Sequence, residues 1–311
     1  MERSRLLPLA GIVVMLVVAE LGAALFGPLM QRAGIVAFEE PGSAANPFIF
    51  LLLLLGFTAL LLLLIRLGMN RVIRAIVLLS IGLSFVYIFI ALLGAVTAEP
   101  AVVLGGAVLL GAGAMAILRH HPEWYVIDLL GLLLTAGVAA IFGTSLGILP
   151  VLLLLVLLAV YDALSVYRTR HMIALAEGVL EQRAPILFVV PKERGYSFIR
   201  DGVGPVDAAS TDAAGPARGE GTGRSALLIG MGDLIMPAIL VVSANTFITA
   251  PGIGFLNGPA LGAIAGSVGG LAVLLRFVDR GRAHAGLPPL NGGAILGFLA
   301  GCAATGAWAW F

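Results

Sequence analysis

Residues 48–65 read FIFLLLLLGFTALLLLLI, an apolar run that contains no charged residue. About 20 apolar residues form a helix long enough to cross the hydrocarbon core of a lipid bilayer. The whole chain of 311 residues is 60% hydrophobic and 11% charged, whereas soluble domains carry about 25% charged residues. This composition excludes an ordinary soluble protein and indicates a chain that uses lipid as its solvent.

Apolar runs of similar length recur on both sides of this stretch. Nine such runs lie at about residues 7–31, 48–65, 72–94, 101–118, 126–143, 148–167, 226–248, 254–275 and 288–311. They predict an all-α, polytopic membrane protein with nine transmembrane helices. The first run lacks a small-residue cleavage site, which indicates a retained span and not a signal peptide.

Basic residues fall on alternate connections between the predicted spans. Of the 18 Lys and Arg residues, only Arg32 lies in an odd-numbered connection. Because basic residues are retained on the cytoplasmic side of a membrane, we expect the N-terminus inside and the C-terminus outside. The aromatic end, Trp308-Ala309-Trp310-Phe311, suits an anchor at the outer interface.

The sixth connection is much longer than the others and divides the chain. Residues 1–167 are expected to form a six-span N-terminal half, and residues 226–311 a three-span C-terminal half. The cytoplasmic loop between them, 168–225, is expected to contain an amphipathic helix (171–183), a β-prone run (Ile186–Val190) and a flexible segment of small residues (201–224).

Acidic side chains are rare inside the predicted spans, and two of them lie at similar depth. Asp162 stands six residues before Arg168, and Asp233 stands nine residues after Arg224. At about 1.5 Å per residue, these acids lie roughly 9 Å and 13 Å from the cytoplasmic edge. An ionisable residue within a span is costly and points to function, and two carboxylates at this depth on different helices can meet.

A close pair of buried carboxylates suits the hydrolysis of peptide bonds. Both groups cannot ionise comfortably at one site, so the pair shares a proton. The ionised partner takes a proton from water, while the protonated partner polarises the scissile carbonyl. Depth alone leaves two alternatives open, a polar pair that ties two helices together and a proton relay.

The residues around both acids favour peptide hydrolysis over a structural pair or a proton relay. Tyr161 precedes Asp162, and Asp233 closes the motif Gly230-Met231-Gly232-Asp233, which has the form GxGD. Glycines remove side chains beside the acid, so a substrate backbone can approach it closely. Pro288-Pro289-Leu290 opens the ninth predicted span.

Tyr-Asp on the sixth span, GxGD on the seventh and Pro-x-Leu on the ninth resemble the presenilin and signal peptide peptidase family of intramembrane aspartyl proteases. The compact, archaeal homologues are the most similar. The resemblance implies that Asp162 and Asp233 are catalytic, and that the chain is an aspartic endopeptidase acting on transmembrane segments of membrane proteins or of signal peptides. It implies site-shaping roles for Tyr161, Gly230, Met231, Gly232, Pro288, Pro289 and Leu290.

Three further points follow from the same resemblance. The run Ile186–Val190 is expected to pair with an unwound segment of the substrate, since a strand edge can bind an extended peptide. The family has Pro-Ala-Leu where this chain has Pro288-Pro289-Leu290, so the second proline stiffens the start of the last helix. The inside position of the N-terminus resembles presenilin and favours type I membrane proteins as substrates.

Other functions remain as alternatives. A prepilin-type peptidase also carries GxGD, but its bacterial forms usually have cysteine pairs, and this chain has only Cys302. A secondary transporter or cation leak could use the same acids, although six plus three spans do not divide into inverted repeats. Gly143–Gly147 matches GxSxG but lacks the strand and the nearby histidine of a serine hydrolase.

The remaining expectations concern ligands, partners and packing. We expect no cofactor, no metal and no nucleic acid, and no obligatory protein partner; the expected partners are transmembrane-helix substrates and the lipid bilayer. A homo-oligomer is compatible with the sequence, and an archaeal-type plasma membrane is the expected location. Glu20 is expected to hydrogen-bond between helices, and Asp128 to lie at the interface. Two glycine ladders, Gly262-Gly266-Gly270 and Gly293-Gly297-Gly301, predict close helix packing.

Overall fold

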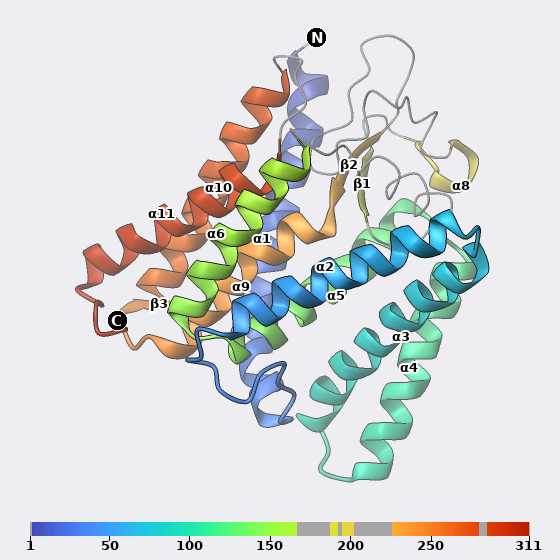
Figure 1. Ribbon diagram of the computed structural model, residues 1–311, viewed down its shortest axis with the longest axis horizontal. Helices are drawn as coiled ribbons and strands as arrows, with labels where there is room; N and C mark the ends of the chain where they lie inside the picture. The colour runs from blue at the N-terminus through green and yellow to red at the C-terminus, as the bar shows by residue number, and fades with distance from the viewer. Residues whose placement is uncertain (1, 167–186, 192–194, 202–225, 280–284, 311) are drawn as a thin grey trace.

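The computed structural model describes residues 2–166, 187–191, 195–201, 226–279 and 285–310, which form a helix bundle with two small β-sheets (Figure 1). The helices are α1 (Glu2–Arg32), α2 (Asn46–Arg66), α3 (Asn70–Gly94), α4 (Pro100–His120), α5 (Trp124–Ser145), α6 (Ile148–Leu164), α8 (Phe198–Asp201), α9 (Met231–Phe247), α10 (Gly258–Asp279) and α11 (Leu287–Thr305). The strands are β1 (Leu187–Pro191), β2 (Ala226–Gly230), β3 (Gly252–Ile253) and β4 (Leu256–Asn257). The predicted helix at 171–183 and nearly all of the predicted segment 201–224 lie outside the described residues.

Most of the predicted spans appear as long apolar helices. Among the described residues, seven helices are long and apolar enough to cross a membrane, namely α1, α2, α3, α4, α5, α10 and α11. The helices α6 and α9 are also apolar but shorter, with 17 residues each. The prediction of a mainly helical, polytopic membrane protein is confirmed, while the count of nine crossings stays a prediction.

The seventh predicted span is not one continuous helix, so the prediction for its first residues was wrong. Residues 226–230 form strand β2, and α9 begins only at Met231. β2 pairs antiparallel with β1, from Leu187 opposite Gly230 to Pro191 opposite Ala226. The two small sheets also make the all-α prediction too simple. A short apolar run fits a strand as well as a helix, and only its tertiary partner decides between them.

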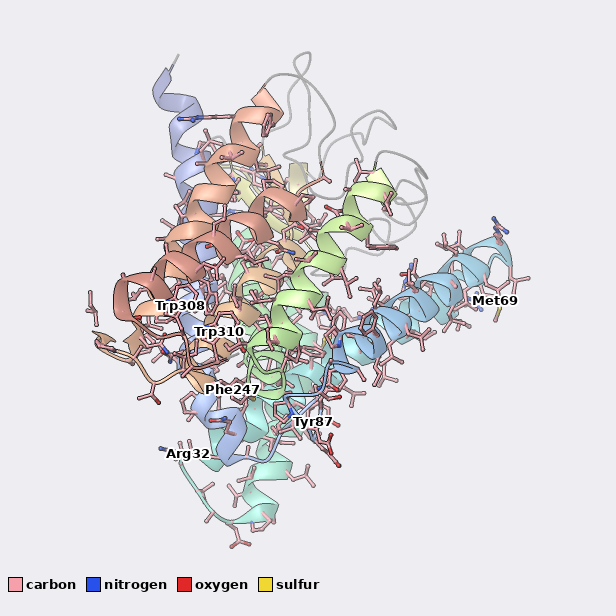
Figure 2. All side chains as sticks on the ribbon, turned by 60° about the vertical axis from the view of Figure 1, so that its left-hand side comes forward. Arg32, Met69, Tyr87, Phe247, Trp308 and Trp310 are labelled. Carbon is pink, nitrogen blue, oxygen red and sulfur yellow. The ribbon has the colours of Figure 1, made fainter. Side chains whose placement is uncertain are left out.

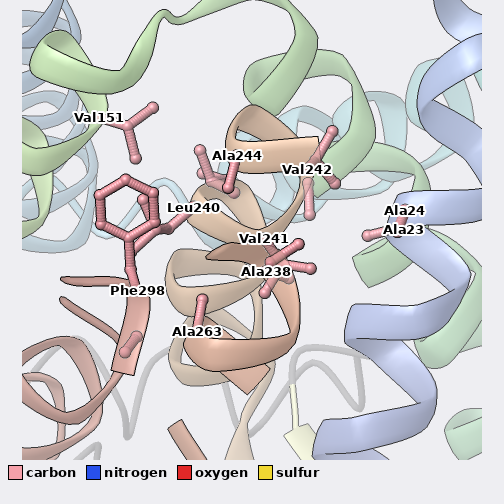
Figure 3. Close-up of a cluster of buried hydrophobic side chains, with 14 of the residues drawn as sticks. Ala23, Ala24, Val151, Ala238, Leu240, Val241, Val242, Ala244, Ala263 and Phe298 are labelled. Carbon is pink, nitrogen blue, oxygen red and sulfur yellow. The ribbon is translucent and has the colours of Figure 1, made fainter. Parts of the chain in front are cut away.

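Helix α9 lies at the centre of the bundle. It packs against α1, α5, α6, α10 and α11. Figure 3 shows side chains of α9 among those of its neighbours, with Ala23 and Ala24 from α1, Val151 from α6 and Phe298 from α11. The central position of α9 places the end of β2, and the GxGD motif that follows it, in the interior of the protein.

Helices α2, α3 and α4 lie to one side of this centre (Figure 1). Figure 2 shows α2 extending away from the bundle toward Met69, with apolar side chains along its length. Many of these side chains are exposed, among them Leu52, Leu53 and Leu63. Exposed leucines on a helix of this kind face lipid in a membrane protein.

Helices α10 and α11 pack through the two predicted glycine ladders. A Cβ atom at Gly262 would collide with the carbonyl oxygen of Gly297, and one at Gly266 with that of Gly293. The two backbones are therefore in direct contact, which side chains larger than hydrogen would prevent. The predicted role of these ladders in helix packing is confirmed.

Candidate functional site

Asp162 lies on the last turn of α6 and is bound to the start of α11. Its side chain is 3% exposed, and its Oδ2 atom accepts a hydrogen bond from the backbone N–H of Leu287 at 3.0 Å. Leu287 is the first residue of α11, where backbone N–H groups lack partners within the helix. The partial positive charge of a helix N-terminus favours a carboxylate at this position.

Asp233 lies on the first turn of α9, directly after β2. Its side chain is 6% exposed, and its Oδ2 atom is buried without a hydrogen-bond partner among the described residues. The carboxyl groups of Asp233 and Asp162 lie close enough to interact electrostatically. The structure thus brings the two predicted acids into one buried site, from helices that enter it from different parts of the chain.

Within the GxGD motif, Met231 packs against another helix, whereas Gly232 leaves open space beside the acid. Gly230 ends β2 in an extended conformation, with φ −66° and ψ 135°. Met231 is buried against α5, where a Cβ atom on Gly131 would collide with its methyl group. Gly232 is exposed, and nothing lies within 4 Å of where its Cβ atom would stand. Open space therefore lies next to Asp233, as expected if a substrate backbone approaches there.

The Pro-x-Leu element forms the first turn of α11, beside the same site. Pro288 and Pro289 occupy helix positions where the missing N–H costs nothing. Leu290 is fully buried in a cluster that also contains Met231 and Leu234. Tyr161 is half-buried on α6. Every residue that the sequence assigns to the site thus lies on β2, α6, α9 or the start of α11.

Asn291 forms a second hydrogen bond between α11 and α6, which the sequence did not predict. Its side-chain Nδ2 donates to the backbone oxygen of Leu155 at 3.1 Å. Leu155 lies two helical turns before Asp162, so α11 contacts α6 at two levels. The only signal in the sequence is a polar residue directly after Pro288-Pro289-Leu290, inside an apolar run.

Asp128 is buried beneath another segment of the chain. Its side chain, which we expected at the interface, is only 4% exposed. Its Oδ1 atom accepts a hydrogen bond from the backbone N–H of Val189 on β1 at 2.8 Å. The β1 segment covers this end of α5, and no local sequence pattern reveals that cover. The position of Asp128 at the membrane interface stays a prediction.

Glu20 is fully buried on α1, against Ser267 of α10. The Ser267 hydroxyl donates to the backbone oxygen of Ile264, and neither carboxyl oxygen of Glu20 has a hydrogen-bond partner among the described residues. Ser267 faces the carboxyl group of Glu20 across the contact between α1 and α10, and the expected interhelical hydrogen bond stays a prediction. Within the same described ranges, no group of three or more His, Cys, Asp or Glu side chains is arranged to hold a metal ion.

Comparison with known proteins identifies the group to which this arrangement belongs. The family described as signal-peptide peptidase, presenilin aspartyl protease matches residues 13–307. The chain belongs to this family. The resemblance predicted from Tyr-Asp, GxGD and Pro-x-Leu is thereby confirmed, and the chain is an integral, multi-pass membrane protein of the presenilin type.

Solved structures agree with the family assignment. Two structures of a presenilin family intramembrane aspartate protease, in space groups C222 and P2, resemble this chain. The first is 46% identical with a TM-score of 0.69 and covers 96% of this chain and 100% of its own. The second is 45% identical with a TM-score of 0.68 and covers 96% of this chain and 99% of its own. No curated protein sequence matches the chain significantly.

Proposed function

We propose that this protein is an intramembrane aspartic endopeptidase in which Asp162 and Asp233 are the catalytic pair. One observation carries the assignment of these residues: two buried carboxyl groups from α6 and α9 converge beside the open space at Gly232. Membership in a family of aspartyl proteases, and the likeness to solved intramembrane aspartate proteases, support the same reaction.

The proposed reaction needs only the two carboxyl groups and water. The pair shares one proton. The ionised carboxylate removes a proton from a water molecule, whose oxygen attacks the carbonyl carbon of the scissile peptide bond. The protonated carboxyl donates its proton to the carbonyl oxygen, and collapse of the tetrahedral intermediate then breaks the C–N bond as the amine leaves with a proton.

We assign substrate pairing to the sheet that leads into GxGD. The N–H of Val189 points to Asp128 and away from β2, so Val189 and Leu228 form a pair that is not joined by ladder hydrogen bonds. The backbone N–H and C=O of Leu228 therefore point to the outer edge of β2. This edge, and not the run Ile186–Val190 favoured by the sequence, is the better place for an added substrate strand.

The proposed topology has nine crossings with the N-terminus inside. The two shorter apolar helices, α6 and α9, complete the seven long ones, and the two chain ends lie at opposite ends of the bundle (Figure 1). In this arrangement 168–225 is a cytoplasmic loop between a six-helix and a three-helix half. The proposed location is an archaeal-type plasma membrane, and the proposed substrates are single-pass transmembrane helices, without an obligatory partner subunit.

A direct assay tests the proposed activity. Purified protein is incubated with a transmembrane peptide, with and without a transition-state inhibitor of aspartyl proteases, and products are identified by mass spectrometry. We expect cleavage that the inhibitor blocks, and less than a few per cent of it in Asp162→Ala and Asp233→Ala, each purified in the folded state. Substantial cleavage by either variant would show that the catalytic pair is wrongly assigned.

A further inference from the structure

A cavity of about 310 Å³ lies where helices α1 and α3 end and α4 begins. Figure 2 shows Arg32 at this end of the bundle. The cavity has the size of a small ligand site, since such sites measure roughly 300–1,000 Å³. None of the described lining residues belongs to α6, α9 or α11, so the cavity is separate from the site of Asp162 and Asp233.

The wall of the cavity is almost entirely apolar. Arg32 and Thr97 are the only lining residues with polar side chains. Ordered water needs several polar partners, so an apolar cavity stays dry, and an unfilled cavity leaves its lining atoms without van der Waals contacts on one side. Leu104, which lines the cavity from α4, is 58% exposed. An exposed leucine on such a helix faces lipid, so the cavity opens toward the hydrocarbon chains of the bilayer.

Arg32 adds a positive charge at the edge of this apolar wall. It is the last residue of α1, its side chain is exposed, and within the described ranges that side chain forms no ion pair or hydrogen bond. It is also the only Lys or Arg residue in an odd-numbered connection, on the face that basic residues usually avoid. Glu99, the nearest acid along the chain to Thr97, is exposed and does not line the cavity. The guanidinium group is therefore available to an anion from outside the chain.

A phospholipid has the two chemical parts that this site matches. A guanidinium group binds phosphate through two parallel hydrogen bonds. The hydroxyl oxygen of Thr97 accepts a hydrogen bond from the backbone N–H of Glu99 at 3.3 Å, and its own proton can be donated to a phosphate oxygen. Because Arg32 ends a membrane-spanning helix, it lies at the level of the lipid headgroups, with the apolar wall on the hydrocarbon side of it.

We propose that this cavity binds a membrane phospholipid, with one hydrocarbon chain inside the cavity and the phosphate on Arg32. In the proposed topology the lipid belongs to the outer leaflet. Helix α4 packs mainly against α3, so the bound chain fills the space that the protein leaves between the end of α1 and the α3–α4 pair. The site goes beyond the proposed proteolysis and does not depend on it.

Lipid binding to the purified protein tests the role of the phosphate. Native mass spectrometry in a mild detergent measures the dissociation constant of the first bound lipid for phosphatidylglycerol and for diacylglycerol with the same chains. Phosphatidylglycerol should bind at least about tenfold more tightly, because only it has a phosphate for Arg32. Arg32→Ala should abolish this preference. Arg74→Ala, at an exposed arginine of α3 that does not line the cavity, should retain it.

A leucine at Gly94 tests the position of the hydrocarbon chain. Gly94 lines the cavity on the same face of α3 as Ile90 and Ala91, and nothing lies within 4 Å of where its Cβ atom would stand. Gly94→Leu should therefore fold normally and weaken the binding of both lipids at least about tenfold. The matched control is Gly105→Leu on α4, which also enters open space but does not line the cavity; its affinities should stay within about twofold.

Thermal unfolding gives a second readout of the same site. Saturating phosphatidylglycerol should raise the unfolding temperature of the unsubstituted protein and of Gly105→Leu, but not of Gly94→Leu, because a ligand stabilises only the state that binds it. Equal affinities for the two lipids, an unchanged preference in Arg32→Ala, unchanged binding in folded Gly94→Leu, or binding that does not saturate would each overturn the proposal. None of these measurements involves cleavage, so the lipid site and the proposed catalysis are tested separately.

Discussion

Helix α2 is very apolar but mostly exposed, whereas helix α9 contains polar residues and is mostly buried. Helix α2 is the most apolar of the seven long helices, yet it buries only Asn46, Pro47, Leu61 and Leu64. Helix α9 contains Asp233, Pro237 and Ser243, and most of its residues are buried. In lipid, a leucine loses little by facing outward, whereas an exposed polar group is costly. The hydrophobicity of a helix therefore does not predict its burial in this protein, because α2 is both the most apolar and the least buried of the seven long helices.

Hydrogen bonds explain how α9 tolerates its central position. The Ser243 hydroxyl donates to the backbone oxygen of Leu146, between α5 and α6, at 2.8 Å. At the end of α9, the Asn257 side chain donates to the backbone oxygens of Ala244 and Ile248, both at 2.7 Å. In the described structure, the apolar length of helix α2 forms no such side-chain hydrogen bonds to other elements, so the position of α2 depends on packing and on lipid.

The largest expected effect concerns the pair of acids formed by Asp233 on α9 and Asp162 on α6. Lowering the pH adds a proton to the pair and removes the general base, and raising the pH removes the shared proton and with it the general acid. Cleavage should therefore follow a bell-shaped profile whose two limbs belong to the pair as a unit. Initial rates across about pH 4 to 9, with folding checked by circular dichroism, test this; a flat profile would contradict a shared proton.

Truncating one leucine on each helix tests the comparison of burial directly. Leu240 on α9 is fully buried, and Leu52 on α2 is 71% exposed. Leu240→Ala should lower the free energy of unfolding by about 3 kcal/mol, because neighbouring helices cannot close the cavity. Leu52→Ala should change it by less than about 0.5 kcal/mol. Denaturation in mixed micelles measures both, and equal losses would break the comparison.

Two glycines on α10 allow the same comparison of a buried with an open position, because one contacts the backbone of α11 and the other does not. Gly266→Ala places a methyl group against the carbonyl oxygen of Gly293, whereas a methyl group at Gly269 meets nothing within 4 Å. Gly266→Ala should cost about 2 kcal/mol by forcing α10 and α11 apart, and Gly269→Ala should be neutral or slightly stabilising. Thermal unfolding of the two variants measures the difference, and similar melting temperatures would argue against a direct backbone contact.

The smallest predicted effect concerns a single hydroxyl group. Ser243→Ala removes the bond to Leu146 and leaves its carbonyl oxygen buried, which should cost about 1 kcal/mol. The matched control is Ser80→Ala on the outer helix α3, where an exposed hydroxyl bonds only to its own helix at Ile76; this change should be neutral. A loss in Ser80→Ala as large as that in Ser243→Ala would show that burial does not decide the cost.

The sequence predicts the helices better than it predicts their contacts. Long apolar runs such as 48–65 identify a span because lipid demands a continuous apolar surface. The convergence of Asp162 and Asp233 follows from their depth and from GxGD. The strand at Ala226–Gly230 escaped prediction because its pairing with Leu187–Pro191 depends on a distant segment. The bonds of Asp128 and Asn291 escaped it for the same reason, since each joins residues more than 60 positions apart.

The short length of α9 has a consequence for the path of water. A helix of 17 residues rises about 25 Å, whereas the hydrocarbon core is about 30 Å thick. Strand β2 continues the chain at the end of α9 that carries Asp233. Because α1, α5, α6, α10 and α11 pack around α9, the one reactant of hydrolysis that a membrane interior lacks must reach Asp233 through the protein and not along a lipid-facing surface.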